Sequence, residues 1–264
     1  MSETPAGKGF WDHLDDLRNV LIKIAVIEFV SAVVLFIFMK WIMDVVILAP
    51  CSHNFPLYSF LGVLNGNEST SIWLPNLGNS SFNVTLINIE LASQFFLHIS
   101  LSCWLALILT FPIIIFELWT FVRPGLYAHE REGAVKAFTI GNLMFFLGIA
   151  VGYFIVFPLT LHFLADYQLS ERIPNTISIN SYIDNFLIII LLMGMVFELP
   201  LLAWLLGKMK LLTRSFFRRY RRHAIVILLI MAAIITPTGD PFTLFMVFIP
   251  IYFLWECSAF IVPK

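Results

Sequence analysis

Long apolar runs separated by polar connections form the main pattern of the chain. Two of these runs, 95–119 and 138–164, lie on either side of a short charged segment, FVRPGLYAHERE. Each run is long enough to cross a bilayer core of about 30 Å, at about 1.5 Å per helical residue. The charged segment is therefore predicted to be a loop at a membrane surface, and its acids are candidates for function. Four more runs bring the predicted spans to six: 22–48, 185–206, 224–236 and 242–262.

Composition agrees with this pattern. The chain of 264 residues is 59% hydrophobic and only 12% charged, and its mean hydropathy is +0.89. No ordinary soluble domain needs such a balance. We therefore predict an all-α polytopic membrane protein that forms a single membrane domain over 1–264.

Three prolines are predicted to shape the membrane-spanning runs and the loop between them. Pro50 follows the first run and is expected to end it, because proline cannot continue a helix. Pro200, two residues after the acid Glu198, is expected to interrupt the fourth run. Pro124, beside Gly125, is expected to supply the turn in the charged segment.

The N-terminal segment 1–21 is predicted to contain a cytoplasmic amphipathic helix. Phe10, Leu14, Leu17 and Leu21 recur at spacings of four, three and four, as on one face of a helix. We expect this helix to lie in the membrane interface beside the first span. Its acids fall outside the apolar face, where a solvated polar surface is the simplest interpretation: Asp12, Asp15 and Asp16.

The segment 51–93 is the polar exception, rich in Asn, Ser, Gly and Pro. We predict an extracytoplasmic cap loop rather than an independent domain. A second polar connection, 165–182, is expected on the same side of the membrane.

The basic residues predict the orientation. Fourteen of the 16 Lys and Arg residues lie at the termini or in the connections that share their side. By the positive-inside rule, both termini and the charged loop therefore face the cytoplasm. The densest group is expected to set topology and to attract anionic lipid head groups: Lys208, Lys210, Arg214, Arg218, Arg219, Arg221 and Arg222.

Five ordered segments resemble the signature blocks of the TatC family, the multispanning receptor subunit of the twin-arginine protein translocase. They are FWDHLDDLR, FPIIIFELWTFVRPGLYAHERE, YFIVFPLTLHFL, GMVFELP and RRHAIVILLIMAAIITPTGDPFT. The resemblance implies six spans in a concave, glove-like arrangement and no enzymatic activity, cofactor, metal or nucleic acid. It further implies a prokaryotic cytoplasmic membrane and export of folded proteins driven by the proton-motive force. The implied partners are signal peptides with paired arginines, membrane lipid, and single-span TatA/TatB-type subunits in an oligomeric complex.

The resemblance also assigns a signal-peptide site on the cytoplasmic side. Asp16 stands where the family's HLxELR block has its acid, and Glu130 stands at the acid of the HERR block. Asp15 is a neighbour that can substitute for Asp16, which is one methylene shorter than the family's Glu. The remaining residues assigned to this site are Phe121 and Pro124, which match F-x-x-P, and Arg18.

Glu198 is a candidate on physical grounds alone. An ionised carboxylate inside a span costs roughly 2.5 to 3.5 kcal/mol on insertion scales, so it is expected to face protein or water or to be protonated. The resemblance implies contact with a polar group of the single-span partners; a protonated acid bonded to a neighbouring helix is the alternative. Glu28, Glu117 and Glu256 lie nearer span ends, where snorkelling or helix capping is expected. A partner contact is also implied at the TPTGDPFT turn: Thr236, Pro237, Phe242 and Thr243.

Two other classes of protein are consistent with many spans. A six-span secondary transporter is the alternative function, but it predicts related halves with matching broken helices, whereas the cap loop and the basic group each occur once. An intramembrane hydrolase requires a pattern such as G-x-S-x-G or H-E-x-x-H, and the chain contains neither.

Overall fold

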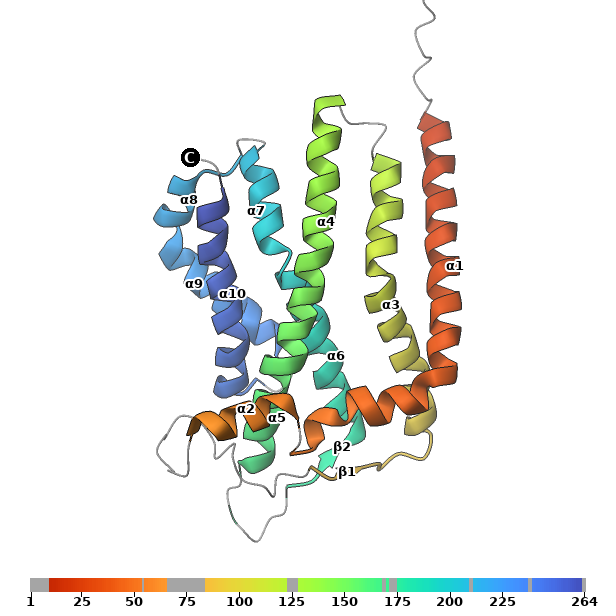
Figure 1. Ribbon diagram of the computed structural model, residues 1–264, viewed down its shortest axis with the longest axis vertical. Coiled ribbons are helices and arrows are strands. Elements are labelled where there is room, and N and C mark those ends of the chain that lie inside the picture. The colour runs from red at the N-terminus through yellow and green to blue at the C-terminus, as the bar shows by residue number, and fades with distance from the viewer. Residues whose placement is uncertain are drawn as a thin grey trace, which may run out of the picture. The chain divides into compact units, whose positions relative to one another are not determined.

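The computed structural model describes residues 10–53, 55–65, 84–122, 128–167, 170, 175–208, 211–236 and 239–262. Within these residues it is almost entirely helical, which confirms the predicted all-helical membrane class (Figure 1). Five helical segments of the described chain are long and apolar enough to cross a membrane: Leu14–Cys51, Ser93–Phe121, Phe138–Asp166, Ile179–Lys208 and Pro241–Ile261. The remaining predicted span, the fifth in the chain (224–236), corresponds to α9 (Arg221–Ile235), which has 15 residues.

The chain divides into two compact units, which are described separately. The first unit contains Met1–Met39 and His98–Thr139, and the second contains Lys40–Leu97 and Ile140–Lys264.

In the first unit, α1 (Phe10–Ile42) packs beside α3 (Ser93–Val122) (Figure 1). The Thr110 hydroxyl donates a hydrogen bond of 2.7 Å to the Glu28 carboxylate, and His98 Nε2 donates one of 2.8 Å to the Phe36 carbonyl. The Phe36 and His98 rings also stack, with centroids 3.9 Å apart. These bonds tie the two helices together inside the apolar region, so Glu28 is paired with a neighbouring helix instead of snorkelling.

Residues 10–21 and the first span form one helix in the structure. The apolar spacing of the N-terminal segment predicted two helices, one of them lying in the interface beside the other. α1 instead runs without a break from Phe10 to Ile42. Its 33 residues include no Gly or Pro, so nothing in the backbone favours a bend, and helix propagation adds a hydrogen bond at each residue.

The third and fourth spans each change conformation in the middle. In the third, α4 (Ala128–Val151) passes through a π-helical turn, Gly152–Val156, into α5 (Phe157–Asp166). In the fourth, α6 (Ile179–Val196) ends at a turn formed by Phe197 and Glu198, and α7 (Leu199–Lys208) follows. Pro158 and Pro200 stand just after these changes, where each lacks the N–H that a continuous helix requires. The predicted interruption at Glu198 and Pro200 is confirmed.

The second unit packs α4 closely against α6 through glycines. A Cβ atom added at Gly148 would lie 2.5 Å from the Met193 carbonyl oxygen and 2.9 Å from the Gly194 Cα. A Cβ atom at Gly194 would in turn lie 2.8 Å from the Phe145 ring. Only glycine permits such close approach of two backbones, which is how helices in membranes gain packing energy.

The first span ends in irregular backbone whose carbonyl groups are bonded by tyrosines. A π-helical turn, Met43–Ile47, is followed by a short 3-10 helix, Ala49–Cys51, which contains Pro50. Tyrosine hydroxyls donate to three carbonyl groups of this stretch: Tyr153 to Val46 at 2.8 Å, Tyr182 to Ile47 at 2.5 Å and Tyr58 to Pro50 at 3.1 Å. Burial raises the pKa of Tyr58, so this phenol remains a donor at neutral pH.

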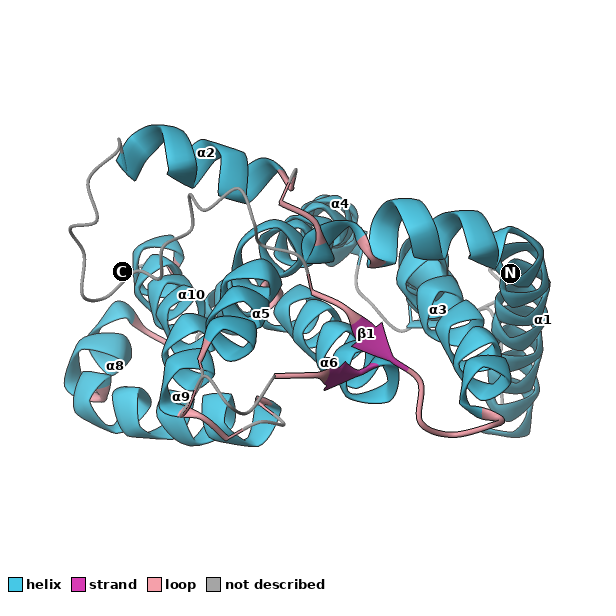
Figure 2. Ribbon diagram, turned by 90° about the horizontal axis from the view of Figure 1, so that it is seen from below, coloured by secondary structure: helices cyan, strands magenta, loops and turns pink. Residues whose placement is uncertain are grey.

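The two predicted extracytoplasmic connections are hydrogen-bonded to each other. The segment 51–93 contains α2 (Pro56–Asn65) and β1 (Leu86–Ile87), and β1 pairs in parallel with β2 (Ile177–Ser178) (Figure 2). Asn180 Nδ2 donates to Glu90 at 3.4 Å, and the Ser93 hydroxyl donates to the Asn180 side chain. Two connections that bond to each other lie on the same side of a membrane, as predicted.

The C-terminal part contains α8 (Arg214–Arg219), α9 and α10 (Pro241–Ile261). Phe217 of α8 is buried against Trp255 of α10, so the basic connection is held to the last span. The turn before α10 uses Gly239 at a φ of 60°, and the Asp240 carboxylate caps α10 by accepting from the Thr243 N–H at 2.7 Å.

Candidate functional site

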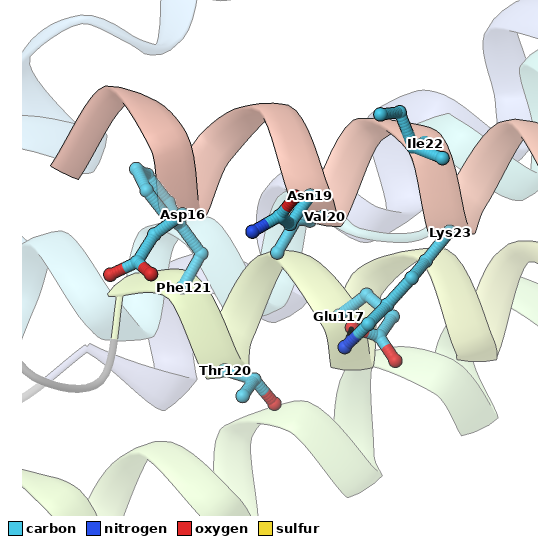
Figure 3. Close-up of a pocket in the computed structure, with 8 residues that line it drawn as sticks. All are labelled: Asp16, Asn19, Val20, Ile22, Lys23, Glu117, Thr120 and Phe121. Atoms are coloured by element: carbon cyan, nitrogen blue, oxygen red, sulfur yellow. Dashed lines mark ion pairs between the residues drawn. The ribbon is translucent and has the colours of Figure 1, made fainter. Parts of the chain in front are cut away.

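A pocket of about 540 Å³ lies between one face of α1 and one face of α3 (Figure 3). Its lining residues recur three or four positions apart in each helix, which is the spacing of residues on a single helical face. They are Asp16, Asn19, Val20, Ile22 and Lys23 from α1, and Glu117, Thr120 and Phe121 from α3.

The polar lining of this pocket contains two acids and one base. Lys23 Nζ is 3.5 Å from Glu117 Oε2, and Figure 3 shows the Lys23 side chain reaching across from α1 to that carboxylate. The Asp16 carboxylate lies toward the end of α3, near Phe121. The described lining therefore carries one net negative charge, which favours a cationic ligand.

The structure brings together two of the predicted signal-site residues, Asp16 and Phe121. It separates Asp15 from them: the Asp15 carboxylate lies 3.9 Å from the Arg18 guanidinium, and both side chains are more than 70% exposed. Asp15 and Arg18 thus pair with each other on the outer surface of α1, which favours Asp16 over Asp15 as the pocket acid. Pro124 lies outside the described residues, and Glu130 lies in the first turn of α4 with its side chain outside the described part.

Val20 and Phe121 belong to the apolar part of the pocket wall. Leu14 is 40% exposed and does not line the pocket, whereas Val20 is buried in its wall. Because α1 continues into the membrane, it turns the face with Asp16 and Val20 toward α3 and leaves Leu14 outside.

Sequence reasoning missed Lys23, Glu117, Asn19 and Thr120. A signal was present, since Asp16, Asn19 and Lys23 lie three and four residues apart. That spacing marks a polar face, but it does not reveal which other helix the face meets. Glu117 was expected to snorkel or to cap a helix end, and it is paired with Lys23 instead.

Glu198 lies against α4 within the second unit. A Cβ atom added at Gly141 would be 3.1 Å from Glu198 Oε2 and 2.7 Å from the Leu201 side chain. The carboxyl group, which is half-buried, therefore covers a glycine of the neighbouring helix and faces protein on that side, as expected for an acid inside a span.

In the TPTGDPFT turn, where a partner contact was predicted, the described threonine and phenylalanine side chains pack against other parts of the same chain. Thr236 and Thr243 are buried, and the Phe242 ring stacks on Phe163 of α5 with centroids 4.0 Å apart. This packing supports a structural role for the turn more than a contact with a partner. Pro237 lies outside the described residues.

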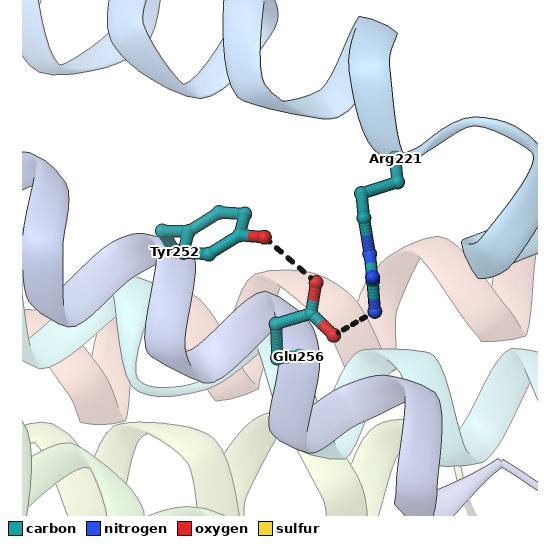
Figure 4. Close-up of polar contacts among 3 residues, drawn as sticks. All are labelled: Arg221, Tyr252 and Glu256. Atoms are coloured by element: carbon teal, nitrogen blue, oxygen red, sulfur yellow. Dashed lines mark hydrogen bonds and ion pairs between the residues drawn. The ribbon is translucent and has the colours of Figure 1, made fainter.

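A second charged cluster lies in the second unit (Figure 4). Glu256 Oε2 accepts a hydrogen bond of 2.6 Å from Arg221 Nη2, and its other oxygen accepts one of 2.9 Å from the Tyr252 hydroxyl. This carboxylate holds the start of α9 to α10, so Glu256 is bonded across helices rather than snorkelling. Among the described residues, no group of three or more His, Cys, Asp and Glu side chains is arranged to hold a metal ion.

Comparison with known proteins agrees with this arrangement. The family model of Sec-independent protein translocase protein (TatC) matches residues 12–250. A TatC protein of Blattabacterium sp. subsp. Periplaneta americana is 31% identical over 96% of this chain and 94% of its own length. One of Helicobacter pylori strain 26695 is 34% identical over 78% of this chain and 79% of its own.

Two crystal structures share the fold. Both are of the twin-arginine translocase receptor TatC, one of them in DDM. The first has a TM-score of 0.70 and 28% identity, and covers 94% of this chain and 97% of that one. The second, in DDM, has a TM-score of 0.73 and 26% identity, and covers 96% of this chain and 100% of that one. The chain thus belongs to the TatC family and is a receptor subunit of the twin-arginine translocase, a multi-pass membrane protein of transport and not an enzyme.

Proposed function

We propose that the pocket between α1 and α3 receives the paired arginines of an export signal, with Asp16 and Glu130 as the accepting acids. The observation that supports this most is the position of Asp16, which lines a net negative pocket beside Phe121. Glu130 belongs to the first turn of α4, in the same compact unit as α1 and α3. Bound in this way, the signal of a folded protein would start assembly of a translocase driven by the proton-motive force.

The chemistry of the acids suits arginine more than lysine. A guanidinium group presents a planar fork that a carboxylate accepts through two parallel hydrogen bonds, whereas an ammonium group is a point charge. Fully exposed ion pairs contribute only about 0 to 1 kcal/mol, so discrimination requires shielding from water. Val20 and Phe121 in the pocket wall supply apolar shielding.

The function is tested with signal peptides that differ only at the twin position. We expect the full chain to bind the Arg-Arg peptide about tenfold more tightly than the Lys-Lys peptide, since bonds to charged groups contribute about 1.5 kcal/mol or more when shielded. Binding is measured by fluorescence anisotropy as salt is varied. Equal affinities at every salt concentration would refute the proposed function.

We further propose that α9 crosses the membrane as a short fifth span, which brings the crossings to six, so that both termini are cytoplasmic. At about 1.5 Å per residue α9 is about 22 Å long, shorter than a bilayer core of about 30 Å, and such mismatch is accommodated by local thinning. The concave, glove-like arrangement that the family resemblance implies belongs to this proposal.

Reporter fusions test the topology. A cytoplasmic reporter fused after Lys264 or within 208–223 is expected to be active, and one within 51–93 is expected to report the opposite side. The reverse pattern would contradict the arrangement with cytoplasmic termini, and with it the placement of the pocket. With cytoplasmic termini, the basic group of α8 and the start of α9 meets the anionic lipid of the cytoplasmic leaflet of a prokaryotic cytoplasmic membrane.

We propose that Glu198 contacts the single-span TatA/TatB-type subunits with which the chain assembles in an oligomeric complex. A carboxyl group at a helix break offers hydrogen bonds that no apolar helix surface provides. Glu198→Ala is expected to weaken association with these subunits about threefold, since a bond between helices in membranes contributes about 0.6 kcal/mol on average.

Signal binding should stay nearly unchanged in that variant, because Glu198 does not line the pocket between α1 and α3. Glu198→Gln is expected to be milder, since an amide retains hydrogen-bonding capacity. Co-purification with the partner subunits measures the effect. Loss of signal binding with normal association would show that the assignment of Glu198 is wrong.

A further inference from the structure

The two members of the ion pair inside the pocket differ in burial. The Lys23 side chain is 61% exposed, whereas that of Glu117 is only 18% exposed. Glu117 is therefore held in the pocket by α3, while the more exposed Lys23 reaches toward it from α1 (Figure 3). Because the ammonium group is the exposed member of the pair, it can leave Glu117 at small cost.

The contact between Lys23 and Glu117 is also loose. Its N to O distance is 3.5 Å, longer than the 2.7–2.9 Å range typical of charge-assisted hydrogen bonds. A firmly bonded pair in the same chain looks different: Arg221 and Glu256 are 2.6 Å apart, and the Tyr252 hydroxyl bonds the second carboxylate oxygen (Figure 4). A cation that approached Glu117 more closely than Lys23 does would therefore form a stronger bond to its carboxylate.

We propose that Glu117 is a further carboxylate that accepts an arginine of the signal, and that Lys23 is its internal counter-ion, displaced when the arginine binds. The inference rests on the proposed function and deepens it. Neither residue belongs to the assigned signal site, which consists of Asp16, Glu130 and their neighbours.

Charge balance supports this exchange. While Lys23 stays on Glu117, the charge of this carboxylate is neutralised within the pocket. Once Lys23 moves away, Glu117 adds a carboxylate to the described lining, beside that of Asp16. The nearby Thr120 hydroxyl, which donates to the Phe116 carbonyl at 3.0 Å, carries no charge, and the charged acceptors of the described lining are the two acids. Lys23 therefore lowers the affinity for the signal while it keeps Glu117 neutralised in the empty receptor.

The test compares four forms of the full chain: wild type, Lys23→Gln, Glu117→Gln and the double variant. Each is titrated with the Arg-Arg and Lys-Lys peptides at two salt concentrations. Lys40→Gln is the matched control, because it removes one positive charge from an exposed position of α1 outside the pocket. Thermal unfolding in detergent confirms that each form is folded.

Lys23→Gln is expected to raise the affinity for the Arg-Arg peptide about threefold, the upper part of what an exposed ion pair contributes, while Lys40→Gln has no such effect. Adding Glu117→Gln to Lys23→Gln is expected to lower the affinity for Arg-Arg about tenfold, and for Lys-Lys clearly less. Only a carboxylate that bonds the guanidinium directly gives this difference, because loss of a distant charge weakens both peptides alike.

Equal losses for the two peptides in the Lys23→Gln background, or no loss at all, would overturn the proposal and leave Glu117 as a structural partner of Lys23. The proposed function fails by a different result, namely no preference of the wild type for Arg-Arg. If the wild type discriminates and Glu117→Gln does not matter in the Lys23→Gln background, only the inference about Glu117 and Lys23 is wrong.

Discussion

Replacing both Asp16 and Glu130 with alanine is expected to lower the affinity for an Arg-Arg signal peptide about a hundredfold. Each carboxylate would otherwise form charged hydrogen bonds worth about 1.5 kcal/mol or more, and about 1.4 kcal/mol corresponds to a factor of ten. Crosslinking or anisotropy measured as salt is varied gives the loss. The remaining binding should also depend less on salt, because two charges have been removed from the site.

Asp15→Ala is the matched control for that double variant. It removes the same kind of side chain from the adjacent position, but Asp15 is exposed and paired with Arg18. We expect its effect on affinity to be less than about twofold, as for an exposed ion pair. Asp16→Glu should be tolerated, and Glu130→Arg should impair export more than Glu130→Gln. Unchanged binding in the Asp16→Ala, Glu130→Ala variant with Asp15 intact would refute the idea that this pair of acids reads the signal.

Gly148→Ala is expected to destabilise the protein by about 1 to 3 kcal/mol, the cost of forcing an extra group into a packed interior. On helix propensity alone the change would stabilise by about 1 kcal/mol. The packing cost exceeds this gain in stability, because the new Cβ would lie 2.5 Å from a backbone oxygen of α6. This oxygen cannot move without shifting the helix.

Gly152→Ala, in the π-helical turn that follows α4, provides the comparison against the same helix α6. Its Cβ would lie 3.2 Å from both the Ile190 Cα and the Met193 Cβ, so it requires a shift of only a few tenths of an ångström. We expect it to be close to neutral. Thermal unfolding in detergent, followed by circular dichroism, measures both. A Gly148→Ala variant as stable as Gly152→Ala would contradict the close approach of α4 and α6.

Much of the fold was predictable because a bilayer makes hydropathy informative. The long apolar runs located the spans, and Glu198 with Pro200 located the break between α6 and α7. The continuity of α1 was not recognised, because the apolar spacing of Phe10 to Leu21 fits an interfacial helix equally well. What decides the outcome is the absence of any residue that breaks the helix between the two segments.

The site was predictable only in part, because the sequence does not show which faces of different helices pack together. Asp16 and Phe121 were found through resemblance to a family. Lys23 and Glu117 are ninety-four positions apart, and no periodicity within α1 or α3 tells that their faces meet. The same holds for Glu28 with Thr110, and for Glu256 with Arg221. Acids near span ends can reach water, but in this chain each of the three bonds a neighbouring helix.

The pairing of β1 with β2 has a consequence for how the protein is made. Leu86 and Ile87 leave the ribosome long before Ile177 and Ser178, and the whole of α3, α4 and α5 is synthesised in between. During synthesis, β1 therefore has no parallel strand to pair with until two further spans have been inserted. Closing this contact across so great a separation in sequence is slow compared with forming a helix. Completion of the surface formed by these two connections is thus a late event in biogenesis, and it depends on correct insertion of the third span.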